Sequence, residues 1–163
     1  MVIILLAAVL VYLGTELKAG NGSEAEAKEM VTKLENIIPG LGSPSDSSGG
    51  NGRDPLAAYI MGDYNVVGCL EIPALDLMLP VVLKSEDPKA EVQSYLVYFE
   101  GGSPVKGQFR LKSDSMGGFK SIAGLAPGEK VVFTDIDGVR YEYTVTTQYH
   151  LKDWDEGDND LLL

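Results

Sequence analysis

The clearest alternation of apolar and polar positions lies between Gly68 and Val81, in the sequence Gly-Cys-Leu-Glu-Ile-Pro-Ala-Leu-Asp-Leu-Met-Leu-Pro-Val. Leucines recur there at every second position, the period of a strand with one buried face: Leu75, Leu77 and Leu79. Pro73 and Pro80 lack an N–H, so we expect them at strand ends, edges or corners and not inside a central ladder. The stretch predicts two short extended segments that open a β-domain.

A second β-pattern lies between residues 130 and 145, where two apolar runs flank Asp135-Ile136-Asp137-Gly138. Asp-Gly between two such runs is a strong hairpin signal. We expect strands at 130–134 and 139–145, with alternate residues of the second strand on one face: Val139, Tyr141, Tyr143 and Val145.

The rest of this half predicts short strands and tight turns. We expect strands at 93–100 and 109–111, one helical turn at 119–124, and a turn at 125–129, where the sequence is Leu-Ala-Pro-Gly-Glu. Many short strands and little helix indicate a mainly β domain, a small closed β-barrel or a sandwich. Seven residues on the expected strands should contribute to its core: Leu75, Leu77, Leu79, Val131, Phe133, Tyr141 and Tyr143.

The N-terminal region has a different pattern, because residues 2–13 are uninterrupted apolar sequence. A membrane-spanning helix needs about 20 such residues, and a signal peptide carries a cationic stretch before its apolar core. The run is shorter than a membrane span, and only Met1 precedes it. If the true N-terminus is missing, both the short length and the absence of a cationic stretch are explained. We interpret residues 1–14 as a partial membrane anchor or signal-anchor; a buried core helix is the alternative.

Residues 23–38 predict a helix, with Ser23 and Glu26 at the spacing of a capping box and Pro39-Gly40 as the stop. Its apolar residues form one stripe, which could pack on the β-domain, self-associate or lie on a membrane. The Gly-, Ser- and Pro-rich sequence that follows predicts a flexible linker. The expected layout is an anchor (1–14), a juxtamembrane helix (23–38), a linker (39–56) and a β-domain (57–163).

Charge and cysteine content limit the function classes. The net charge is −11 and the pI about 4.4, which argues against nucleic acid as a partner because a phosphate backbone needs a basic face. Cys69 is the only cysteine of the sequence, so no intramolecular disulfide can form. Its position in an apolar strand favours a small core residue over a reactive thiol.

Four segments, taken in order, resemble the sortases, the cysteine transpeptidases of Gram-positive cell surfaces, and are most similar to the class B-like members. The first is the Gly68–Val81 stretch, which is similar to the two opening sortase strands. The second is Phe-Lys-Ser-Ile-Ala-Gly-Leu-Ala-Pro-Gly-Glu-Lys-Val at 119–131, and the third is the hairpin at 133–145. The fourth is Gly-Asp-Asn-Asp-Leu-Leu-Leu at 157–163, similar to the approach to the family's "T-L-x-T-C" strand. The resemblance implies a sortase-like closed β-barrel with an N-terminal apolar segment and a short helix.

The resemblance also implies a reaction, in which a thiolate attacks a sorting-signal carbonyl, a histidine exchanges protons and an arginine steadies the oxyanion. None of these residues is intact at its family position. The histidine slot falls near Asp114, and a carboxylate there would raise the pKa of a nearby thiol. The cysteine slot falls about three residues beyond Leu163, and the arginine slot follows it.

His150 is the only histidine, and it precedes an acidic loop at 153–160. A half-exposed histidine paired with a carboxylate is the expected role. The loop could supply oxygen ligands to calcium, but its glycine is at the wrong offset for an EF-hand, so we expect a solvated loop and no metal site.

The sequence therefore predicts a membrane-tethered, sortase-like domain on the extracytoplasmic face of the cell membrane, without a cofactor. By family its partner is the sorting-signal peptide of surface proteins that are joined to the cell wall or pilus. We expect the chain as given to be inactive. A degenerate sortase that binds peptide or envelope partners without chemistry is the second hypothesis, and an unrelated secreted β-barrel is the third.

Overall fold

The computed structural model describes residues 24–42, 52–83, 95–114, 122, 124–147 and 158–162. Within these residues the chain forms an α-helix at 24–37, a short 3-10 helix and eight strands. The elements after the α-helix are β1 (Tyr59–Met61), β2 (Tyr64–Ile72), η1 (Pro73–Leu75), β3 (Leu77–Leu83), β4 (Val97–Ser103), β5 (Gly107–Asp114), β6 (Lys130–Asp135), β7 (Arg140–Thr144) and β8 (Asp158–Leu162). The prediction of a mainly β fold is confirmed.

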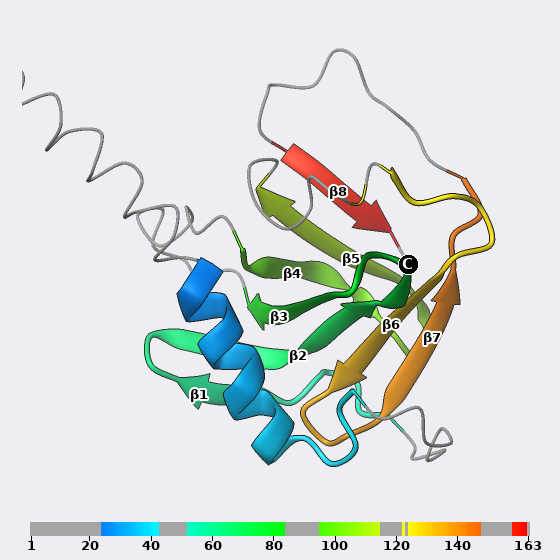
Figure 1. Ribbon diagram of the computed structural model, residues 1–163. Coiled ribbons are helices and arrows are strands. Elements are labelled where there is room, and N and C mark those ends of the chain that lie inside the picture. The colour runs from blue at the N-terminus through cyan, green and yellow to red at the C-terminus, as the bar shows by residue number, and fades with distance from the viewer. Residues whose placement is uncertain are drawn as a thin grey trace, which may run out of the picture.

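All eight strands belong to one sheet with the order β7-β6-β2-β3-β4-β5-β8, and β1 pairs with β2 outside this order. β3 and β4 are paired in parallel, whereas β2 is antiparallel to both β3 and β6. The sheet curls into a half-barrel (Figure 1). Among the described strands, no ladder joins β7 to β8, the two ends of the order. The curled sheet is thus established, and full closure of the barrel stays a prediction.

The connection from β2 to β3 differs from the expected alternation. Pro73–Leu75 forms η1, and Asp76 follows it in the left-handed conformation with φ 49°. The Asp76 N–H donates a hydrogen bond to the Pro73 carbonyl at 3.2 Å. The expectation that Leu75 lies in a strand is therefore wrong, because three leucines at period 2 do not distinguish a strand from a turn that leads into one.

The two prolines of this segment have different positions. Pro73 begins η1 directly after β2 ends, as expected of a residue without an N–H. Pro80 lies inside β3, opposite Cys69 of β2, and meets the expectation of an edge position. The pairing of β3 with β4 starts only at Val81. At Pro80 the described ladder is therefore one-sided, which is where a sheet tolerates proline.

The predicted hairpin at residues 130–145 is confirmed as β6 and β7. Phe133 pairs with Tyr141, and Val131 pairs with Tyr143. The chain reverses between Asp135 and Val139, where the Asp135 N–H donates a 3.0 Å hydrogen bond to the Val139 carbonyl, and Gly138 has φ 84°. The Pro127-Gly128 turn that precedes β6 is confirmed as well.

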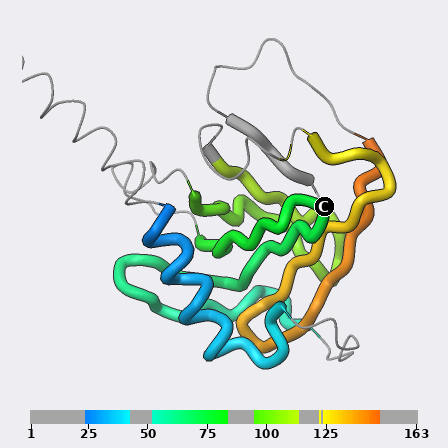
Figure 2. Tube along the Cα trace, in the orientation of Figure 1, coloured from blue at the N-terminus to red at the C-terminus, as the bar shows by residue number. Residues whose placement is uncertain are grey.

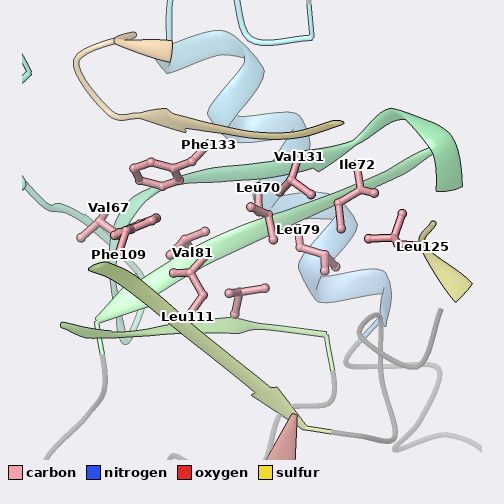
Figure 3. Packing of buried hydrophobic residues seen from close by; sticks show 11 residues of the cluster. Val67, Leu70, Ile72, Leu79, Val81, Phe109, Leu111, Leu125, Val131 and Phe133 are labelled. Atoms are coloured by element: carbon pink, nitrogen blue, oxygen red, sulfur yellow. The ribbon is translucent and has the colours of Figure 1, made fainter. Parts of the chain in front are cut away.

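The concave side of the sheet holds the inner cluster, a set of eleven buried apolar residues: Val67, Leu70, Ile72, Leu79, Val81, Val97, Phe109, Leu111, Leu125, Val131 and Phe133. Figure 3 shows Phe109 and Phe133 next to each other, and their ring centroids are 4.7 Å apart. All seven predicted core residues contribute. Leu79, Val131 and Phe133 are fully buried, and the other four are partly buried against the cluster: Leu75, Leu77, Tyr141 and Tyr143.

The helix at 24–37 packs on the other side of the sheet, over β1, β2 and β3 (Figures 1 and 2). Its apolar stripe and the residues after it form the outer cluster with the sheet: Met30, Val31, Leu34, Ile38, Leu41, Met61, Val66, Cys69, Val82 and Leu96. Of the three roles left open for the stripe, the structure therefore shows packing on the β-domain.

The predicted linker (39–56) is described at both of its ends. Leu41 is buried in the outer cluster, and Leu56 packs against the inner cluster. Residues 43–51, between them, lie outside the described part, as does the predicted anchor at 1–14. The helix and the start of the predicted linker therefore share the outer cluster with the sheet, and the end of the linker packs on the inner cluster.

Candidate functional site

Cys69, the only thiol of the chain, lies in the middle of β2 and is fully buried. It contacts the outer cluster below the helix, in register with Pro80 of β3 and Thr134 of β6. Burial raises the pKa of the Cys69 thiol to about 12, and the negative charges of Glu71 and Glu35 add to this effect, against a lowering backbone hydrogen bond at Leu79. A nucleophilic cysteine needs an accessible thiolate. The prediction of a core residue is confirmed.

Asp114, at the predicted histidine slot, is the last residue of β5 and pairs with Asp158 of β8. The two strands are antiparallel, so the opposite end of the pairing joins Arg110 to Leu162. At about 3.4 Å per residue, β8 carries the chain roughly 14 Å along β5 between Asp158 and Leu162. The direction of β8 therefore leads away from Asp114 and toward the start of β5.

Two further predicted positions lie outside the described residues. His150 is one of them, and the other is the acidic loop, except for the backbone of residues 158–160 in β8. In the part of the chain that the structure describes, no group of three or more histidine, cysteine or carboxylate side chains could hold a metal ion.

The most organised polar group among the described residues was missed by the sequence analysis. The buried Asp135 carboxylate lies at the end of β6, where its Oδ1 accepts hydrogen bonds from the Asp137 N–H at 3.0 Å and the Val139 N–H at 2.8 Å. Its Oδ2 accepts one from the Tyr141 hydroxyl at 3.4 Å. An aspartate at the first position of a turn often binds the backbone N–H two residues on, and this signal could have identified it.

The surroundings of Asp135 set its protonation. Burial raises the pKa of the Asp135 carboxyl, and the nearby Asp137 adds to the effect, whereas the hydrogen bonds from Val139, Asp137 and Tyr141 lower it. Burial and the same two carboxylates raise the pKa of Tyr141 to about 12. Because its oxygens are engaged by the hairpin itself, Asp135 stabilises the β6–β7 turn and is not a free base.

A row of charged side chains crosses the convex side of β2, β6 and β7. The largely buried Arg140 guanidinium lies between two carboxylates, 3.4 Å from Glu71 Oε2 through Nη1 and 3.4 Å from Glu142 Oε1 through Nε. Lys130 Nζ lies 3.3 Å from Glu142 Oε2. Lys130, followed by Arg140, lowers the pKa of the Glu142 carboxyl. Arg140 is thus engaged in ion pairs with two carboxylates. Among the described residues, no nucleophile is paired with it.

Of the predicted catalytic slots, only Asp114 lies within the described residues, at the end of β5. None of the described helices is both long enough and apolar enough to cross a bilayer. The sequence matches no known protein-family model, and no curated protein matches it.

Proposed function

We propose that this chain carries a sortase-like domain of the extracytoplasmic membrane face, related by family to the cysteine transpeptidases, and that the chain as given performs no thiol transfer. The burial of Cys69 is the observation that supports the absence of thiol transfer. A thiol with a pKa of about 12 below a packed helix supplies neither the thiolate nor the access that acyl transfer requires.

The order of the elements supports the sortase-like half of the proposal. The resembling segments fall in chain order on one fold, with β4 and β5 between the first two. They are β2, η1 and β3 for the opening strands, the Pro127-Gly128 turn and β6 for the second, the β6–β7 hairpin for the third, and β8 for the last. Closure of the half-barrel into a barrel is part of this proposal. It is supported by the contact between Phe109 of β5 and Phe133 of β6, which are separated by three strands in the sheet order.

The second candidate is a domain that binds a sorting-signal peptide or another envelope partner without chemistry. It is favoured by Asp114, because an aspartate at the histidine slot cannot act as the imidazolium that activates a thiol. In the chain as given, neither candidate performs a covalent step, so both predict binding without cleavage; they differ in whether the domain is related to the transpeptidases.

One experiment tests both the peptide partner and the absence of cleavage. A panel of quenched fluorogenic peptides with sorting motifs of several sortase classes is incubated with the full chain and with Cys69→Ser. Binding is measured by anisotropy and cleavage by fluorescence, with scrambled peptides as the control. We expect no cleavage by either protein, and none by Asp114→His, because the nucleophile is still missing.

Each outcome has a consequence. Binding without cleavage supports the sortase-like binding domain. Cleavage that is lost in Cys69→Ser contradicts the assignment of Cys69 to the core. Absence of binding to every peptide in the panel contradicts the sortase-like peptide partner.

A further inference from the structure

The segment Gly52–Leu56, which precedes β1, crosses between two hairpins at one end of the half-barrel. Residue 52 lies between side chains of both hairpins: a Cβ added to Gly52 would overlap the Tyr141 hydroxyl of β7 and lie 3.0 Å from Val105 Cγ2 in the β4–β5 turn. A Cβ at this position would therefore displace the Tyr141 side chain. The close approach is made by the glycine backbone, between the two hairpins.

The next two residues form ion pairs with two different turns of the sheet. Arg53 Nε lies 3.1 Å from Asp137 Oδ2, in the turn between β6 and β7. Asp54 Oδ2 lies 2.5 Å from Lys106 Nζ, in the turn between β4 and β5. Exposed pairs contribute little individually, so their main effect here is to orient the segment.

Leu56 then packs against the inner cluster. The segment is therefore held by a backbone contact, two charges of opposite sign and one apolar side chain. Pro39, after the α-helix, meets the same β6–β7 turn, since its Cδ and carbonyl oxygen lie 3.3 Å from a Cβ added to Gly138. Both ends of the predicted linker thus meet the sheet near one turn.

The segment Gly52–Leu56 contacts two hairpins that are not paired with each other in the described sheet. The β6–β7 and β4–β5 hairpins lie on opposite sides of the β2–β3 pair in the sheet order, and no described ladder joins them. We propose that Gly52–Leu56 is a latch, which holds the β7 edge of the half-barrel to the β4–β5 turn in place of strand pairing. The latch controls opening of the barrel at this end.

Hydrogen exchange of the full chain tests the latch. Gly52→Ala should raise the exchange rate of the β7 amides and of the β4–β5 turn by roughly tenfold, because local opening then costs less. The control is Gly124→Ala, since a Cβ there meets no atom within 4 Å. Exchange in β2 and β3 should stay unchanged in both variants.

Equal exchange in wild type and Gly52→Ala would overturn the latch. A uniform rise over β2, β3 and β7 would overturn it as well, since the segment would then contribute only to global stability.

A charge exchange keeps the proposal testable if Gly52→Ala does not fold. Arg53→Asp and Asp137→Arg should each raise β7 exchange a fewfold, and the double variant that carries both changes should return it to the wild-type rate. An additive loss in the double variant would contradict the role of this pair in the latch.

Discussion

The two faces of the curled sheet are buried by different parts of the chain. The inner face is filled by the sheet's own side chains, with rings in contact from β4 to β7: Phe99, Phe109, Phe133 and Tyr141. The outer face is buried by a helix that comes from outside the sheet, over β1, β2 and β3 and with Tyr98 of β4. Over β6 and β7 the same face carries the Arg140 charge ladder. The inner face is thus buried by the half-barrel sheet itself, whereas the outer face depends on a second element.

The packing of the inner face could be predicted from the sequence, whereas the packing of the helix on the outer face could not. Val131, Phe133, Tyr141 and Tyr143 alternate along two strands joined by an Asp-Gly turn, so one local pattern predicts both their pairing and their common face. The outer face gives no such signal, because the helix residues and their partners are separated by tens of positions. Periodicity identifies the stripe of the helix but not the surface that covers it.

The candidate site was harder to predict than the fold. The apolar neighbours of Cys69 correctly indicated a core residue, but its position below the helix required the tertiary structure. Asp135 has the local sequence of a turn-forming aspartate, yet nothing in it predicts burial beside Tyr141. Strand direction was also beyond the sequence, since no local pattern shows that β8 runs antiparallel to β5.

The largest expected effect is on the inner face. Phe133→Ala should lower the free energy of unfolding by roughly 3–5 kcal/mol, because it empties the centre of the ring contacts. Urea denaturation followed by circular dichroism measures this, with Ile60→Ala as the control, since Ile60 is 75% exposed. A loss no larger than that of Ile60→Ala would contradict a core at Phe133.

Leu34→Ala tests the outer face. Leu34 is fully buried between helix and sheet, whereas Ile37 on the same helix is 37% exposed. We expect a loss of about 2–3 kcal/mol for Leu34→Ala and less than about 0.5 kcal/mol for Ile37→Ala, because only the first leaves a cavity. Equal losses in urea denaturation would indicate that the helix is not part of the core.

The smallest effect concerns pH and the β6–β7 turn. Burial raises the pKa of Asp135 in the folded state, so its neutral form favours folding. The stability that this carboxyl contributes is present below its unfolded pKa and is lost as pH rises through its folded pKa. Asp135→Asn keeps an acceptor oxygen without the charge. The stability of wild type minus that of the variant should therefore fall, by less than about 2 kcal/mol, as pH rises from acid to neutral. Urea titrations at several pH values measure this difference, and a difference that rises with pH would contradict the direction.

The reactivity of Cys69 tests the central claim, a structural thiol below a docked helix, most directly. With a pKa of about 12, roughly one thiol in ten thousand is ionised at pH 8. Labelling with a thiol reagent in native buffer should be negligible, should reach the rate of a free cysteine in denaturant, and should be faster in Leu34→Ala than in Ile37→Ala. Native labelling of wild type at the rate of a free cysteine would contradict the burial of Cys69, and with it the proposal that this chain performs no thiol transfer.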